Sequence, residues 1–537
     1  RASAAPPRVC VTTRTRASAI ARAMYVVASV DPSSTTIASH PPNVCAKSDD
    51  SALPIVSRAL CAGMTMLTVG GAATRQSYSS RRLSTSVTEH CVRHLRGRID
   101  RDKRALGELG GMFRASALTV AVSLSLALVA LVNTSVTARA LGVEGRGLLA
   151  SALLVVSLAR GLALLGLGEA FVYHGRNGRL TADGRRHLGT ALAIVAVVGA
   201  LVAAAFVPFG PLKTELGVAG ITIALAASGA FFDLLVACSR FDPALRIFNW
   251  LRALGPILAT LSLVVVWVFV ALSVETVLAL QTVATLCAGM AGYVAISRLL
   301  ATRSGPLTTD AQLSIPQFLR SGIGFQGIAV LGLFLTHAHM YFVMSVGTLT
   351  AFGIYSAAFG LSRMISFIQM SIGSAVFASS AGGVDSRAGA SALKAFRLTF
   401  LPMILVAGIV AALSPLVTRL LLGPEFDAAA PPLAILAFEA VIAGAAFILG
   451  QHLQAVGRVT SVLTRNAFSM IPIILGLVIL DASNVVLGMA WLMLTASGLR
   501  LTATLFAYHS QHGTEALRLI PSRQDLSTLR TLARGPL

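Results

Sequence analysis

Two arginine residues lie about midway along strongly apolar stretches of the sequence, where a charged side chain is costly to keep. Arg160 follows Gly147 by thirteen residues, and Arg363 follows Gly353 by ten. A guanidinium group stays protonated and offers a planar set of donors that suits phosphate oxygens. Two such groups facing one cavity would suit a pyrophosphate headgroup, so we predict that both bind an anionic substrate. The alternative is that each pairs with carbonyls or an acid of a neighbouring helix and only braces the bundle.

Three acidic residues are candidates for counter-charges or for ion coupling within the same apolar stretches. Glu439 lies a little beyond the middle of its stretch, whereas Glu169 and Asp233 lie nearer the ends of theirs. A carboxylate in such a place either carries a proton or sodium ion or neutralises an arginine. We predict one of these two roles for Glu439, and for the other two either ion coupling or contact with water and nearby arginines. Arg252 is also close to the end of a stretch, where its long side chain is expected to reach polar surroundings.

The elements that would hold these residues are long apolar helices. Between Ala115 and Tyr508 the sequence divides into about twelve apolar stretches, each near the roughly 20 residues that cross a hydrocarbon core. Basic residues gather in every second break between stretches, an asymmetry that marks cytoplasmic loops. They are Arg176, Arg179, Arg185 and Arg186; Arg240 and Arg246; Arg298, Arg303 and Arg320; Arg387, Lys394 and Arg397; and Arg458 and Arg465. We therefore predict an all-α, multi-pass membrane protein with both chain ends in the cytoplasm.

The composition agrees with this interpretation. Of the 537 residues, 55% are hydrophobic and 12% are charged, outside the usual range of soluble globular proteins. The net charge of +21 lies mostly in the N-terminal region, the predicted cytoplasmic loops and the C-terminal tail, where it contacts anionic membrane lipids. No nucleic-acid partner is predicted, because no soluble domain would carry one. No bound cofactor or metal is predicted either, since the sequence has no G-x-x-x-x-G-K-[ST] loop and His337 and His339 do not share a helix face.

Five segments are predicted. Residues 112–300 form an N-terminal lobe with helices 1–6, residues 301–315 a cytoplasmic linker, residues 316–508 a C-terminal lobe with helices 7–12, and residues 509–537 a basic cytoplasmic tail. The turn LGVEGRG at 141–147 resembles VGTLTAFG at 346–353, so the lobes are predicted to be two copies of one six-helix unit around a central cavity. Residues 1–111 are basic, rich in Ser, Thr and Ala, and expected to be disordered. Because Met112 stands just before the first stretch, we expect them to be a dispensable tail or sequence upstream of the true start.

Several short motifs, taken in order, resemble one family of membrane transporters. They are TARALGVEGRG at 137–147, GIYSAA at 353–358, LGPEFDAA at 422–429 and AVGR at 455–458. Their order and spacing resemble those of the bacterial lipid-linked oligosaccharide (O-antigen type) flippases of the multidrug/oligosaccharidyl-lipid/polysaccharide exporter superfamily. The resemblance covers about residues 113–508. One departure is Thr336-His337-Ala338-His339, where many relatives carry an acidic residue late in helix 7, which puts an ion-coupling role at that position in doubt.

The resemblance implies a flippase, not an enzyme, that moves a polyprenyl-pyrophosphate-linked oligosaccharide from the inner to the outer leaflet of the plasma membrane for surface polysaccharide synthesis. It implies a polyprenyl-linked glycan lipid as the substrate, with a polysaccharide polymerase and glycosyltransferases as partners. A proton or sodium gradient, or consumption of the sugar by polymerisation, is expected to supply the downhill step. One alternative is an ion-coupled drug or small-molecule exporter of the same superfamily, whose cavity would carry acids rather than arginines. A membrane enzyme would need clustered His and Asp near one face, which the sequence lacks.

Overall fold

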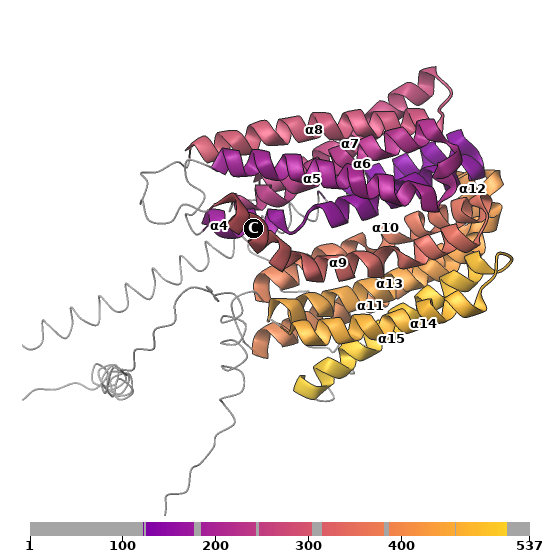
Figure 1. Ribbon diagram of the computed structural model, residues 1–537. Coiled ribbons are helices and arrows are strands. Elements are labelled where there is room, and N and C mark those ends of the chain that lie inside the picture. The colour runs from indigo at the N-terminus through magenta and orange to yellow at the C-terminus, as the bar shows by residue number, and fades with distance from the viewer. Residues whose placement is uncertain are drawn as a thin grey trace, which may run out of the picture. The chain divides into compact units, whose positions relative to one another are not determined.

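A computed structural model describes residues 122, 125–176, 184–242, 246–302, 314–380, 386–456 and 458–512 (Figure 1). The predicted extension 1–111, most of the linker 301–315 and most of the tail 509–537 lie outside the described residues. The described residues form helices joined by short turns, without a strand among them. The prediction of an all-α chain is therefore confirmed for this part of the protein.

The helices follow one another along the chain with few intervening residues. In the first half they are the helical segment Ser125–Gly175, which runs into α4 (Leu167–Arg176), then α5 (Gly184–Phe206), α6 (Leu216–Cys238), α7 (Arg246–Phe269) and α8 (Val274–Thr302). In the second half they are α9 (Ile315–Val346), α10 (Leu349–Ser380), α11 (Ser386–Ala412), α12 (Ser414–Leu421), α13 (Ala430–Ala455), α14 (Val459–Ile479) and α15 (Val485–His512). Short 3-10 turns follow α5, α6 and α12.

Nine helical segments in the described part of the chain are long and apolar enough to cross a membrane. The first, Ser125–Gly175, has 51 residues and as one straight helix would measure about 75 Å, more than twice the thickness of a hydrocarbon core. Gly142 interrupts it with φ +66°, a left-handed conformation that glycine adopts readily, at the predicted outer turn. α9 and α14, with 32 and 21 residues, are not among the nine. The chain is thus a multi-pass membrane protein, while twelve crossings and cytoplasmic ends stay predictions.

Each half has one helix at its centre. α6 and α13 are mostly buried, whereas α5, α7 and α11 are buried over a much smaller part of their length. α6 packs against α5 and α8, and α13 packs against α10, α11 and α15 (Figure 1). Large apolar side chains such as Leu201, Val268 and Leu405 are exposed on the outer helices. Such a surface fits contact with lipid rather than with water.

The two halves meet backbone to backbone at two glycines from the resembling turns. A Cβ atom added to Gly147 would overlap the carbonyl oxygen of Leu349 and lie 3.2 Å from the Gly353 nitrogen. A Cβ atom added to Gly353 would overlap the carbonyl oxygen of Val143 and lie 3.1 Å from the Gly147 nitrogen. Each glycine faces the residue four positions before the other, so the contact is reciprocal. Helices come this close only where small residues permit it.

A shared apolar core surrounds this glycine crossing. Leu158 of the second arm (residues 143–163) belongs to one buried cluster with Phe352 and Tyr355 of α10. The Thr350 hydroxyl also donates a hydrogen bond to Glu144 Oε1 at 3.4 Å. The halves are therefore in contact at the end of the bundle that is predicted to face outside, and they also meet where α9 packs against α4.

Candidate substrate cavity

A cavity of about 580 Å³ lies among the helices of the first half. Its wall is formed by the first arm (residues 125–141), the second arm, α6, α7 and α8, and Phe367 of α10 contributes to one side. Pro256, inside α7, also lines it. A proline in a helix interior removes one backbone hydrogen bond and bends the helix, which shapes the wall at this point.

Three arginines line the cavity: Arg146, Arg160 and Arg252. Arg146 is buried and donates from Nη1 to Thr137 Oγ1 at 3.0 Å, close to the predicted outer end. Arg160 lies about 20 Å further along the second arm, and Arg252 lies about 9 Å into α7 from Arg246 at its predicted cytoplasmic start. No aspartate or glutamate is among the described residues that line this cavity.

Neutral hydrogen-bonding side chains make up the rest of the polar wall. They are Asn133, Thr134, Ser157, Thr260, Gln281 and Thr285. The Asn133 amide donates to Thr260 Oγ1 at 3.3 Å, which joins the first arm to α7. Hydroxyl and amide groups suit sugar hydroxyls, and guanidinium groups suit phosphate oxygens. The wall can therefore bind a headgroup that combines negative charge with hydroxyl groups.

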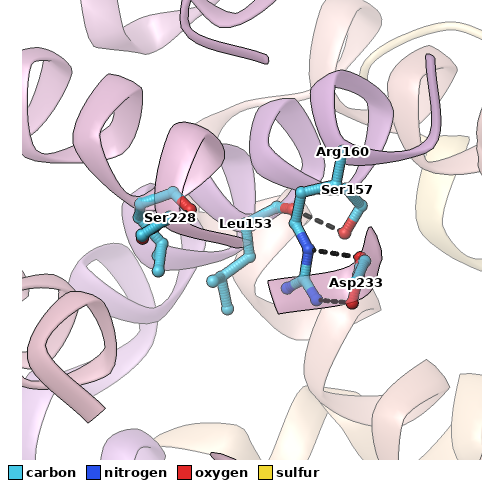
Figure 2. A network of polar contacts seen from close by, with 6 residues as sticks. Leu153, Ser157, Arg160, Ser228 and Asp233 are labelled. Atoms are coloured by element: carbon cyan, nitrogen blue, oxygen red, sulfur yellow. Dashed lines mark hydrogen bonds and ion pairs between the residues drawn. The ribbon is translucent and has the colours of Figure 1, made fainter. Parts of the chain in front are cut away.

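Arg160, one of the two predicted anion-binding residues, lines this cavity and is also ion-paired. Its Nε donates to Asp233 Oδ2 at 2.8 Å and its Nη2 to Oδ1 at 2.5 Å (Figure 2). The Arg160 and Asp233 side chains are 30% and 31% exposed. Asp233 thus lies beside an arginine, and both side chains are partly exposed, although only Arg160 lines the cavity.

Arg363, the second predicted residue, is not among the residues that line this cavity. It forms an ion pair with Glu439 of α13, whose side chain is fully buried. Ser497 of α15 donates to Glu439 Oε1 at 2.7 Å, and Arg500 Nη2 donates to Ser497 Oγ at 3.2 Å. Phe367, one helical turn beyond Arg363 on α10, reaches the cavity wall. Arg363 therefore does not line the cavity and is instead paired with Glu439.

The remaining candidates lie elsewhere in the fold. Glu169 faces Arg240, with Oε1 and Nη1 3.6 Å apart, and both side chains are about half exposed. His339 is buried and its ring centroid lies 4.7 Å from that of Phe359. His337 lines a smaller cavity of about 370 Å³ beside α9. The two histidines thus have different surroundings, in line with their expected placement on different helix faces.

Arg252 lines the cavity although the sequence did not predict it there. Its position near a helix end suggested a side chain that reaches polar surroundings at the membrane surface, but it lines the cavity instead. Gly255 and Pro256 follow Arg252 within about one turn and also line the cavity. A glycine and a proline inside an apolar stretch are the sequence signal that was available at this position. Which face of α7 turns inward depends on how α7 packs against the two arms and α8, and this requires the tertiary structure.

The fold itself resembles those of solved membrane transporters. The lipid II flippase MurJ, in an inward closed conformation, aligns with a TM-score of 0.59 and 12% identity over 78% of this chain and 93% of that chain. A mutant of the MATE transporter VcmN from Vibrio cholerae aligns with a TM-score of 0.51 and 16% identity over 76% and 98%. An outward-facing multidrug resistance MATE family transporter of the MOP superfamily aligns with a TM-score of 0.53 and 14% identity over 74% and 96%.

Comparison by sequence gives no match to a protein-family model or to a curated protein. At identities of 12–16%, the likeness to solved structures establishes the fold alone. These solved structures are of transporters and a flippase, not of enzymes. The fold of this chain therefore resembles those of a lipid II flippase and of MATE transporters.

Proposed function

We propose that this protein is a flippase that moves a polyprenyl-pyrophosphate-linked oligosaccharide from the inner to the outer leaflet of the plasma membrane. The observation that carries the proposal is the charge of the cavity wall, which has three arginines and no carboxylate among its described lining residues. Asp233 offsets the charge of Arg160, but Arg146 and Arg252 still leave the wall positive. A positive cavity favours an anionic headgroup and disfavours a cationic drug.

In this proposal the pyrophosphate binds Arg160 and Arg252, and the sugar binds the neutral hydrogen-bonding side chains. The polyprenyl tail stays in the lipid, because moving an apolar chain through a polar cavity would expose it to water. Rocking of the two halves would then carry the headgroup past the glycine crossing to the outer side. Arg363 would meet the substrate only in a state where its pair with Glu439 turns toward the cavity.

The runner-up is an ion-coupled exporter of drugs or other small molecules, which the likeness to MATE transporters supports equally at the level of fold. The two functions require opposite cavity charge, since an exporter of cations needs carboxylates to replace the water around its cargo. Either function could be driven by coupling to a proton or sodium gradient. Glu439 is our candidate for it, because it is a fully buried carboxylate that an ion could release from Arg363.

Reconstituted vesicles distinguish these functions. We expect vesicles that contain the protein to expose a polyprenyl-pyrophosphate glycan from the inner leaflet to an external lectin. Arg160→Gln and Arg252→Gln should each lower that rate by about tenfold or more, because each removes a charge-assisted hydrogen bond. Arg186→Gln is the matched control, since Arg186 is exposed at the start of α5 and does not line the cavity. Undiminished transport by both cavity variants, or transport of a cationic dye instead of the glycan lipid, would contradict the proposal.

A further inference from the structure

The Arg160 side chain, which lines the cavity, is held in an ion pair. Two of its nitrogens donate to the two oxygens of Asp233, at 2.8 and 2.5 Å (Figure 2). This is the paired, planar geometry in which a guanidinium also binds a phosphate group. The donors proposed to bind the substrate are therefore already used by a carboxylate of the protein itself.

Gly229 makes this contact possible. It lies one helical turn before Asp233 on α6, so both residues are on the same face of that helix. A Cβ atom added to Gly229 would lie 2.6 Å from Arg160 Cδ, 2.8 Å from Nε and 3.1 Å from Cζ. The arginine side chain therefore lies flat across Gly229 before it reaches Asp233. We call Gly229 and Asp233 together the arginine dock.

The side chains of the docked pair are partly exposed. The Arg160 and Asp233 side chains are 30% and 31% exposed, and Arg160 lines the cavity. An anion in the cavity can thus approach the guanidinium, and Asp233 can turn toward water when it loses its partner. A carboxylate and a phosphate are both negative, so they cannot both be held closely by one guanidinium without repulsion. Docking of Arg160 and binding of an anion by Arg160 are therefore competing states.

We propose that Asp233 and Gly229 hold Arg160 when the cavity is empty, and that a phosphate group of the substrate displaces Asp233 from it. The inference rests on the proposed function and adds an exchange step to it. The dock keeps the charge of Arg160 paired at membrane depth while no substrate is present. It also weakens binding, because only the undocked fraction of Arg160 is free to hold the anion. The same competition speeds release once the cavity opens to the outer side.

Two variants weaken the dock in different ways, and purified protein with inorganic pyrophosphate as the probe tests both. Asp233→Asn removes the negative charge, whereas Gly229→Ala keeps every charge and only pushes Arg160 out of its place. We expect each variant to bind pyrophosphate about tenfold more tightly than the wild type by titration calorimetry. Gly220→Ala is the matched control, because Gly220 lies on the same helix with open space where its Cβ would be. The gain should vanish when Arg160→Gln is added to either variant.

The results separate this inference from the function on which it rests. If the wild type binds pyrophosphate and neither dock variant binds it more tightly, the exchange is wrong and the anion-binding cavity stands. If neither the wild type nor any variant binds pyrophosphate, both proposals are wrong. If Asp233→Asn does not give monodisperse protein, Gly229→Ala decides the question, since it leaves the ion-pairing groups in place.

Discussion

Replacing Gly353 with alanine should loosen the crossing that joins the two halves at the predicted outer end. The added Cβ would overlap the Val143 carbonyl oxygen and lie 3.1 Å from the Gly147 nitrogen, so two helix backbones would have to move apart. Backbone strain is not involved, because the conformation at Gly353 is helical and alanine is a good helix former. The effect is therefore steric and acts on the state in which the halves touch.

The size of the effect follows from the overlap. Extra atoms forced into a tightly packed contact typically cost about 1–3 kcal/mol. Because a state with the halves apart would not feel this overlap, the full cost shifts the balance between the two states. At about 1.4 kcal/mol for each factor of ten, the joined state should lose between about fivefold and 150-fold in relative population.

Thiol cross-linking reports this population directly. Glu144 and Thr350 hydrogen-bond across the crossing at 3.4 Å, so cysteines at these two positions should be joined efficiently by a short bifunctional reagent. We expect the initial rate of cross-linking to fall when Gly353→Ala is added, and the ratio of joined to separated protein derived from it to fall at least fivefold. Gly360→Ala on the same helix is the control, because a Cβ there meets open space. An unchanged cross-linking rate with Gly353→Ala would refute the view that backbone contact at these glycines holds the halves together.

Two further predictions concern stability. Glu439→Ala leaves Arg363 without its buried carboxylate and should lower the free energy of unfolding by about 3 kcal/mol. This value is at the lower end for buried pairs because the Arg363 side chain is 29% exposed. Glu439→Gln should lower the free energy of unfolding by less. Titration with dodecyl sulfate in mixed micelles measures this, and equal stability of the alanine variant and the wild type would contradict it. In the turn before α15, hydrogen bonds from the Ser483 hydroxyl and backbone amide hold the pKa of Asp481 below its ordinary value. The turn should therefore be protected above the ordinary aspartate pKa of about 3.9 and lose protection as the pH falls through the lower folded pKa. Hydrogen exchange of this turn checks the expectation, and the same pH dependence in Asp481→Asn would rule it out.

The two halves of the fold use their buried charges differently. In the first half, the Arg160–Asp233 pair is partly exposed beside a cavity that two more arginines line. In the second half, the Arg363–Glu439 pair has a fully buried carboxylate that Ser497 also contacts. Both pairs join the helix after the glycine crossing to the central helix of their half, α6 or α13. An accessible pair can exchange partners with a ligand, whereas a buried pair holds helices together until something removes its charge.

The sequence by itself determined the class of the protein and the places of its elements. Apolar stretches of about 20 residues can be stable only as helices in lipid, because every backbone group must then be satisfied within its own segment. The predicted all-α fold was therefore confirmed for the described residues, and the fold resembles those of a lipid II flippase and a MATE transporter. The sequence also drew attention to Arg160, Arg363, Asp233 and Glu439, because charges within apolar stretches are rare and costly.

Only the tertiary structure decided which of these charges meet and which face the cavity. In an apolar helix the hydrophobic pattern is similar on all sides, so it does not tell which face turns inward. For this reason the sequence could not place Arg252 in the cavity wall, pair Arg160 with Asp233 across Gly229, or leave Arg363 outside that wall. Those relations depend on contacts between helices that are 70 or more residues apart, such as the pair of Arg160 and Asp233. The helices could thus be predicted from the apolar stretches of the sequence. The cavity forms only where helices distant in the sequence pack together.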